Sequence, residues 1–300
     1  HEFPVVQLNI TDANLIMTKN KVNTITLAQG KASLRLGGTV KNSLGNDYPT
    51  GKRKVMWACH PPENVAIDDN EKLDATVTFT KNGLYELTLT VKNSDEDTKT
   101  ASAHVQITVN EAPVVDAGPD QVIILPGKST LDATVSDDGL PNPPGILELA
   151  WSASSDKATI ENPKADYTSA TFSDKGTYKL KLSAFDGVVT SADEVTVIVN
   201  KAPVVDAGVG AAVKYQEPIP LSGTVTDDGF GDESQRVPIA VSWAMESGPE
   251  QPTFANAADL NTTVTFSKKG VYVLKVTAKD EYGESNDTVR FTVNQPPRNS

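Results

Sequence analysis

The 300-residue chain has little or none of several features, and each shortage excludes a class of structure or function. Its single cysteine, Cys59, rules out a disulfide within the chain. No apolar run reaches the roughly 18 residues that a membrane-spanning helix needs, so we expect no membrane span. Basic residues are outnumbered, with 27 Lys and Arg against 39 Asp and Glu and a net charge of −12. We therefore expect no nucleic-acid partner, because phosphate recognition needs a basic surface.

Catalytic groups are equally scarce. The three histidines, His1, His60 and His104, belong to no nucleophile motif. Cys59 and His60 are adjacent, but a haem-attachment motif would need a second cysteine where the chain has Met56. We interpret the Cys59–His60 pair as part of a strand end, with a zinc or copper site as the alternative. The sequence predicts that the chain is not an enzyme.

What the chain does have is one phrase that recurs about every hundred residues. The stretch Thr171–Gly187 reads TFSDKGTYKLKLSAFDG, and variants of it begin at Thr78 (TFTKNGLYELTLTVKNS) and Thr265 (TFSKKGVYVLKVTAKDEYG). In each copy a turn is followed by alternating apolar and polar residues, which is typical of a strand with one buried face. Repetition at a fixed spacing indicates an array of similar domains.

The repeat divides the chain into domain one (1–110), domain two (111–200) and domain three (201–300). Each domain closes with a Val-rich strand that ends in Asn, and Pro follows within three residues, so the joints should be short and stiff. The closing residues are Asn110, Asn200 and Asn294. After Asn294 the linker pattern starts again, so domain three is expected to include the start of a further linker.

The strand pattern predicts an all-β protein made of three tandem immunoglobulin-like β-sandwiches arranged as a rod. No stretch shows sustained helical periodicity, and each domain offers about seven short strands. Trp57, Trp151 and Trp243 fall on the third strand of their domains, where we expect them in the core. Tyr178 has the setting of a tyrosine corner. In domain one, the surplus residues of Asn9–Gln29 could add an edge strand.

Residues of domains two and three resemble PKD (polycystic kidney disease) repeats of the bacterial and archaeal extracellular type, here three in tandem. The carriers in domain two are PVVDAG from Pro113, SDDG from Ser136, Trp151 and AFDG from Ala184. Domain three matches nearly as well, and domain one matches only in its second half. The resemblance implies a secreted or cell-surface protein of a bacterium or archaeon. Modules of this kind serve as spacers, adhesins, surface-layer pieces and accessories of carbohydrate enzymes.

Acidic turns mark where chemistry could take place. In such a sandwich the start of the first strand, the loop between the second and third strands and the loop between the last two strands lie at one pole. Carboxylates that meet there with an Asn side chain and a backbone carbonyl suit Ca²⁺, which takes six to eight oxygen ligands. The predicted ligands are Asn110, Glu111, Asp137, Asp138 and Asp186 in domain two, and Asn200, Lys201, Asp227, Asp228 and Asp280 in domain three.

Two interpretations of these turns stay open. Some PKD domains of secreted proteases bind calcium at the matching positions, so the resemblance implies a cation, whereas Asp-Asp-Gly also makes turns without one. Asp193 and Asp287 are weaker extra candidates. Domain one has Asn42-Ser43 and Asn93 at these places, and its 12 acidic residues balance 12 basic ones, so we expect no calcium there.

Together these features predict a non-enzymatic extracellular structural or adhesive repeat protein: a stalk, surface-layer piece or fibre subunit with calcium at its joints. The alternative is a carbohydrate- or protein-binding accessory module of a secreted hydrolase, which would need a row of exposed aromatic side chains. Expected partners are other copies of the chain, neighbouring domains of a longer array, or a cell-surface polysaccharide or protein. The aromatic residues expected in loops are Tyr48, Tyr167, Tyr215, Phe230 and Tyr282, and sequons for glycosylation occur at Asn9, Asn261 and Asn286.

Overall fold

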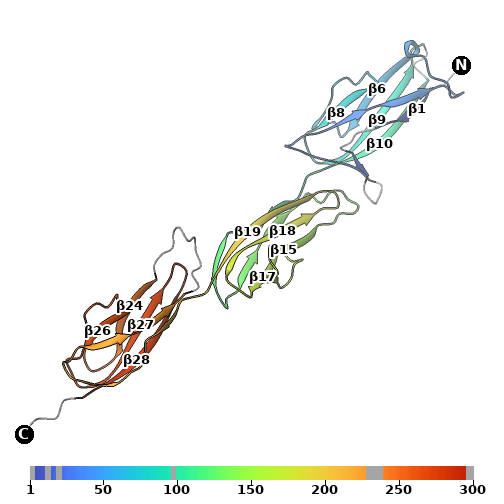
Figure 1. The fold of residues 1–300 in the computed structure, drawn as a ribbon. Coiled ribbons are helices and arrows are strands. Elements are labelled where there is room, and N and C mark those ends of the chain that lie inside the picture. Colours follow the sequence, from blue (N-terminus) through green and yellow to red (C-terminus); the bar gives the residue numbers. More distant parts are fainter. Residues whose placement is uncertain (1–3, 11–14, 18–21, 96–98, 228–238, 295–300) are drawn as a thin grey trace, which may run out of the picture.

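The computed structural model describes residues 4–10, 15–17, 22–95, 99–227 and 239–294. They form three β-sandwiches that follow one another in an extended row (Figure 1). Among the described residues, the single helical segment is one short 3-10 turn, η1 (Thr50–Lys52). The prediction of an all-β chain of three tandem immunoglobulin-like sandwiches is therefore confirmed.

Domain one is built from a five-stranded sheet, a three-stranded sheet and a two-stranded pair. The sheets run β2–β3–β10–β9–β6, β4–β8–β7 and β1–β5. Their strands are β1 (Val5–Leu8), β2 (Ile16–Met17), β3 (Asn23–Thr26), β4 (Ala32–Leu36), β5 (Gly38–Lys41), β6 (Arg53–His60), β7 (Val65–Ile67), β8 (Ala75–Phe79), β9 (Gly83–Asn93) and β10 (Thr100–Asn110). The edge strand predicted within residues 9–29 is present as β2, which pairs antiparallel with β3.

Domains two and three share one topology, with sheets β12–β19–β18–β15, β13–β17–β16 and β11–β14 matched by β21–β28–β27–β24, β22–β26–β25 and β20–β23. The strands of domain two are β11 (Val114–Asp116), β12 (Gln121–Ile124), β13 (Ser129–Asp132), β14 (Thr134–Ser136), β15 (Glu148–Ala153), β16 (Ala158–Ile160), β17 (Tyr167–Phe172), β18 (Gly176–Phe185) and β19 (Thr190–Asn200). Those of domain three are β20 (Val204–Asp206), β21 (Ala212–Lys214), β22 (Ile219–Ser222), β23 (Thr224–Thr226), β24 (Ala240–Ser247), β25 (Thr253–Phe254), β26 (Asn261–Thr265), β27 (Gly270–Lys279) and β28 (Glu284–Asn294).

The last strand of each domain carries an early strand beside it in parallel. β3 pairs with β10, β12 with β19 and β21 with β28. Each of these pairings ends at the closing Asn, whose backbone carbonyl accepts a hydrogen bond from the chain just after the early strand. The donors are the amides of Leu27, Leu125 and Tyr215, at N···O distances of 2.8, 2.9 and 3.1 Å. The closing Asn is thus held in the same way three times.

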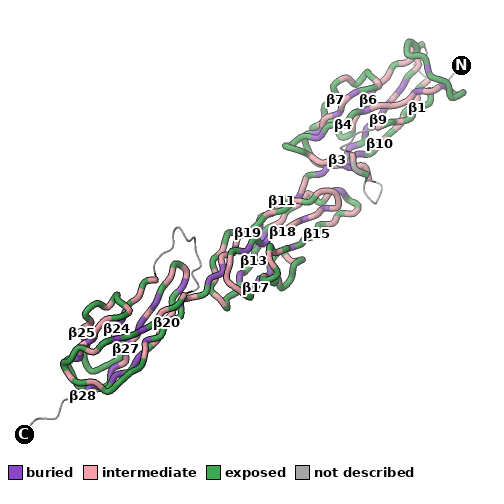
Figure 2. Tube along the Cα trace, in the orientation of Figure 1, coloured by how far each residue is buried: buried purple, intermediate pink, exposed green. Residues whose placement is uncertain are grey.

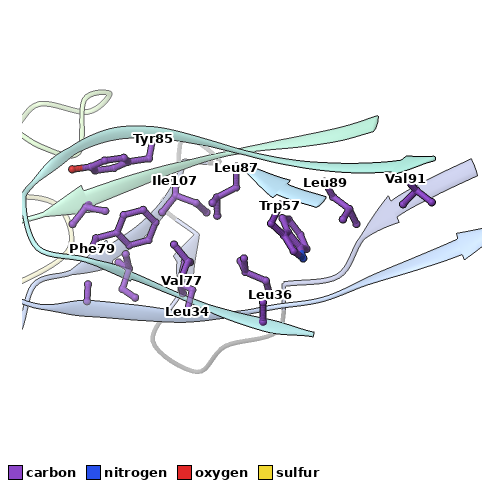
Figure 3. Close-up of a cluster of buried hydrophobic side chains, with 14 of the residues drawn as sticks. Leu34, Leu36, Trp57, Val77, Phe79, Tyr85, Leu87, Leu89, Val91 and Ile107 are labelled. Atoms are coloured by element: carbon purple, nitrogen blue, oxygen red, sulfur yellow. The ribbon is translucent and has the colours of Figure 1, made fainter. Parts of the chain in front are cut away.

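Each sandwich has its own closed core, and its buried positions lie along the inner strands (Figure 2). In domain one Trp57 lies between the sheets beside Leu36 and Leu89 (Figure 3). Its indole N–H donates to the carbonyl of Leu73, and Trp151 and Trp243 donate to the carbonyls of Ala165 and Leu260 in the same manner. The three Trp are at most 5% exposed, which confirms their core role.

Tyr48 corrects one expectation. It lies in a loop, as predicted, but its side chain is only 4% exposed and belongs to the core of domain one, so it is not an exposed aromatic residue. The cause is the hairpin after β5, in which the amide of Tyr48 donates to the carbonyl of Val40 and turns the ring inward.

A tyrosine corner fastens the entry to the long strand of each domain. The hydroxyl groups of Tyr85, Tyr178 and Tyr272 donate to the carbonyl four residues earlier, at 3.0, 2.8 and 2.8 Å. The Gly two residues before each Tyr has a φ between 144° and 151°, which side chains rarely adopt. Each Tyr ring packs on the Phe of the recurring phrase, with ring centroids 4.5 to 4.8 Å apart. The phrase therefore encodes a corner as well as a strand.

The corner of domain two can be tested with Tyr178→Phe. The substitution keeps the ring and removes one hydrogen bond, so we expect domain two to lose about 1 kcal/mol of stability. Hydrogen exchange of β18 and β19 measures this domain by itself. Tyr167→Phe is the matched control, because Tyr167 is 66% exposed, and it should change nothing. Equal exchange rates in the two variants would show that the corner contributes no stability.

Candidate functional site at the domain joints

The first joint centres on a buried Asn and a buried Asp from different domains. Asn110 ends β10, and Asp186 follows β18; each is 0% exposed. The side-chain Nδ2 of Asn110 donates to Oδ2 of Asp186 at 2.9 Å. The other carboxylate oxygen, Oδ1, accepts from the amides of Val188 and Val189, both at 2.7 Å. The carboxylate of Asp186 is thus bonded by three N–H groups, and one of them belongs to the preceding domain.

Asp138, in the loop between β14 and β15, also connects domains one and two. Its Oδ2 accepts from Nδ2 of Asn82, in the turn before β9, and from the amide of Glu111, both at 2.9 Å. Its Oδ1 accepts from the amide of Leu140 at 2.8 Å. Asn82 was missed by the sequence analysis. Its signal is that domain one has KNG where its siblings have DKG and KKG.

Asp137 lies at the same pole and is less well satisfied. Its Oδ2 accepts from the amide of Gly139 at 2.9 Å, but its Oδ1 is buried and has no hydrogen-bond partner among the described residues. Burial raises the pKa of Asp137, and the charges of Asp138 and Asp186 raise it further. The Oδ1 of Asn110 is also buried and has no partner in the described part of the chain. Two oxygen acceptors at this joint are therefore unused.

The second joint repeats the central bond of the first. Asn200 is 1% exposed, and its Nδ2 donates to Oδ2 of Asp280 at 2.9 Å. The Oδ1 of Asp280 accepts from the amides of Tyr282 and Gly283. A β-carbon on Gly283 would lie 3.0 Å from Cδ1 of Ile124 in domain two, so the domains also touch through apolar atoms. The two joints thus have different linker residues but the same hydrogen bond from Asn to Asp.

The structure brings together most, but not all, of the predicted cation ligands. Asn110, Asp137, Asp138 and Asp186 meet at one pole, as expected from the strand order. Glu111 takes part through its backbone, since its carbonyl accepts from Asn110 and its amide donates to Asp138. At the second joint, Asn200 and Asp280 are in contact, Asp227 follows β23, and Asp228 lies outside the described residues.

Lys201 points away from the pole. Its Nζ lies 3.2 Å from Oδ1 of Asp174, in domain two, and Lys157 binds the other oxygen of that carboxylate at 2.8 Å. The hydrogen bonds from Lys157 and then Lys201 hold the pKa of Asp174 far below its ordinary value. The side chain of Lys201 therefore ties the linker back to domain two.

Four other positions considered in the sequence analysis accept backbone hydrogen bonds: Asn42, Asn93, Asp193 and Asp287. In domain one, Oδ1 of Asn42 accepts from the amides of Leu44 and Asn46, and Oδ1 of Asn93 accepts from the amide of Asp95. Asp193 and Asp287 accept at 2.9 Å from the amides of Ala117 and Ala207, which fastens the first strand of each domain to its last. These backbone hydrogen bonds are the main reason that the pKa of Asp193 and of Asp287 is lowered.

The fit of this pole to a metal ion is mixed. Among the residues that the structure describes, no group of three or more His, Cys, Asp or Glu side chains is arranged to hold a metal ion. All four carboxylate oxygens of Asp138 and Asp186 already accept amide hydrogens. The unused, buried Oδ1 atoms of Asn110 and Asp137 nevertheless have the chemistry that a hard cation prefers.

The Cys59–His60 pair is poorly suited to a soft metal. Cys59 is half-buried, and burial raises the pKa of its thiol to about 11. Among the described residues, this pair is not part of any group of three or more His, Cys, Asp or Glu side chains that could hold a metal ion. In the described part of the chain, no helix is long and apolar enough to cross a membrane.

Two of the three domains match known protein families. Residues 117–199 match the family described as "K319L-like, PKD domain", and residues 205–293 match the PKD domain family. The chain is 34% identical over 234 residues to the mouse dyslexia-associated protein KIAA0319-like protein, covering 72% of this chain and 21% of that protein. It is 29% identical over 253 residues to human dyslexia-associated protein KIAA0319, covering 77% and 23%. The chain thus spans about a fifth of the length of these relatives.

More distant similarities concern the fold and the range of organisms. Internalin I of Listeria monocytogenes is 27% identical over 238 residues, covering 77% of this chain and 12% of that protein. Relatives therefore include animal and bacterial proteins, and the bacterial or archaeal character stays a prediction. The titin fragment I67–I69 superimposes with a TM-score of 0.50 at 14% identity, covering 97% of this chain and 99% of the fragment. That likeness supports the fold of three immunoglobulin-like domains.

The raised pKa of Asp137, whose Oδ1 is buried, leads to a prediction about pH. Because its pKa is raised in the folded state, ionised Asp137 destabilises domain two at neutral pH, and this cost disappears as the pH falls below its ordinary pKa of about 3.9. In buffer with a chelator, Asp137→Asn should therefore slow hydrogen exchange of β18 and β19 at pH 7 and have little effect near pH 3.5.

Asp132→Asn is the control, because Asp132 is exposed on β13. It should leave exchange unchanged at both pH values. Faster exchange in Asp137→Asn at pH 7 would contradict the argument, because it would mean that the charge of Asp137 stabilises the joint.

Proposed function

Because residues 117–199 and 205–293 are PKD-type domains, we propose that the chain is a non-enzymatic extracellular spacer that holds adhesive or structural parts of a surface protein at a set distance. One observation carries this proposal: both joints are closed by the same hydrogen bond, buried at the first joint and partly buried at the second, from the last Asn of one domain to the Asp after the long strand of the next. A hydrogen bond to a charged group contributes roughly 1.5–3 kcal/mol. This energy favours the docked orientation of two domains over the other orientations that a flexible linker would allow. The three sandwiches then act as one stiff unit in a stalk, surface layer or fibre.

The accessory-module alternative finds less support. A carbohydrate-binding face wants several exposed aromatic side chains in a row. Tyr167, on β17, is the one large aromatic side chain that is exposed among the described residues, and Tyr48 is buried. A single exposed ring favours a spacer over a sugar-binding platform.

We further propose that Ca²⁺ binds at both joints and stiffens them. At the first joint, Asn110 and Asp137 would offer their unused Oδ1 atoms, with Asp138 and Asp186 adding negative charge. Asn200, Asp227, Asp228 and Asp280 are the counterparts in domain three. When bound, the cation would neutralise carboxylates that now repel one another. Domain one has Asn42 and Asn93 at these positions and would bind none.

The test is hydrogen exchange with a chelator and with excess calcium, on one protein sample. At about 100 times its Kd, calcium should stabilise each binding domain by about 2.7 kcal/mol. Exchange should slow most in β18 of domain two and β27 of domain three, and less in β9 of domain one, whose one proposed ligand is Asn110 at the end of the neighbouring β10.

Asp137→Asn should abolish the effect in domain two and leave it in domain three. Small-angle scattering of the same samples tests the spacer separately, because a stiff rod keeps its maximum dimension when salt is varied. If calcium changes nothing in any domain, the cation proposal is wrong; if the maximum dimension is spread over a broad range, the spacer proposal is wrong.

A further inference from the structure

Domain one carries an open groove beside β6, the edge strand of its five-stranded sheet. The groove has a volume of about 720 Å³, within the range of ligand-binding pockets. Among its described lining residues, Arg53, Lys54 and Lys92 are cationic and Glu71 is anionic. The chain as a whole has a net charge of −12. The groove is therefore a basic site on an acidic protein.

The two lysines of this groove lie directly opposite each other on neighbouring strands. Lys54 of β6 is in register with Lys92 of β9, and both side chains are exposed. Like charges that face each other across an antiparallel pair destabilise a sheet. An anion placed between the two ammonium groups would be attracted by both of them. The pair is thus unfavourable for the fold alone and favourable for an anionic ligand.

The other two domains do not keep two cations at this register. In each domain the first position lies three residues before the core Trp and pairs with the long strand that follows the tyrosine corner. Domain two has Glu148 opposite Phe185, and domain three has Ala240 opposite Lys279. The sandwich therefore forms without the lysine pair, which indicates that the pair has a role particular to domain one.

An added peptide strand does not fit along this edge of β6. The backbone amide of Trp57 donates to the carbonyl of Asn70 at 2.7 Å, and its indole N–H donates to the carbonyl of Leu73. The segment 70–73 therefore occupies the edge that a further strand would need. A ligand must instead be held by side chains. Besides the cations, the groove offers the hydroxyl groups of Thr50 and Thr90, which can bond the hydroxyl groups of a sugar.

We infer that this groove binds an acidic polysaccharide, whose carboxylate or sulfate groups contact Arg53, Lys54 and Lys92. Arg suits such oxygen pairs through its forked donors, and Lys acts as a compact charge. Met56 also lines the groove, is 52% exposed and can pack on the apolar face of a sugar ring. This recognition depends on charge rather than on a row of aromatic rings. It requires neither calcium nor the spacer role.

The experiment titrates the full chain, in buffer with a chelator, with three hexasaccharides: a sulfated one from heparin, a carboxylated one from hyaluronate, and neutral maltohexaose. NMR follows the backbone amides. We expect at least one acidic hexasaccharide to shift the resonances of β6 and of the segment 71–73, and its affinity to fall as NaCl is added, because salt screens exposed charges. Maltohexaose should shift none of them. The two acidic ligands distinguish sulfate from carboxylate recognition.

The variant with both Lys54→Gln and Lys92→Gln should bind the acidic hexasaccharide about tenfold more weakly, as the loss of two exposed ion pairs implies. The matched control carries Lys268→Gln and Lys269→Gln, which remove the same charge from the exposed turn before β27. It should keep the affinity of the wild type. Hydrogen exchange of β9 verifies that domain one remains folded in both variants.

Equal weakening in the two variants would overturn the inference, because binding would then follow the net charge of the chain. The inference also fails if neither acidic hexasaccharide shifts the resonances of β6. A hexaglutamate peptide is the remaining comparison. If it binds the groove more tightly than both acidic hexasaccharides, the ligand is an acidic peptide and not a polysaccharide.

Discussion

The carboxylate that closes each joint, buried at Asp186 and partly buried at Asp280, is the constraint on which the arrangement of the domains depends. An ionised Asp without exposure must be surrounded by donors, since an unpaired buried charge is costly. Asp186 obtains two donors from its own turn and the third from Asn110 of the domain before it. The pole of domain two is therefore complete only when domain one is in place. A local electrostatic requirement thus fixes how one sandwich sits on the next.

The same device gives the array a direction. A domain ends in an Asn donor, and the next domain presents to it the Asp acceptor that follows its long strand. The parallel pairing of the early strand with the last strand places the Asn reproducibly. Domain one breaks the series with Asn93, which keeps the turn but exchanges an acceptor for a donor.

The fold and the grouping at the poles could be predicted because they depend on local, repeated signals. Alternation in the recurring phrase shows the strand, and Gly176 with Tyr178 shows the corner. The predicted strand order alone was enough to place Asn110 and Asp186 at the same pole. Which donor bonds to which acceptor at the pole could not be predicted, because this depends on the direction of each side chain. Lys201 turns back to Asp174 of domain two, and Asp193 accepts from the first strand of its domain, away from the pole. The contribution of Asn82 was missed because it comes from a turn in the other domain.

The central claim is that the Asn-to-Asp bond, without any cation, holds neighbouring domains in one orientation. Residual dipolar couplings measured in the presence of a chelator test it most directly, on the wild type and on the variant with both Asn110→Ala and Asn200→Ala. The account predicts that one alignment tensor fits all three domains of the wild type and that separate tensors are needed for the variant. Separate tensors in the wild type, or one shared tensor in the variant, would contradict it.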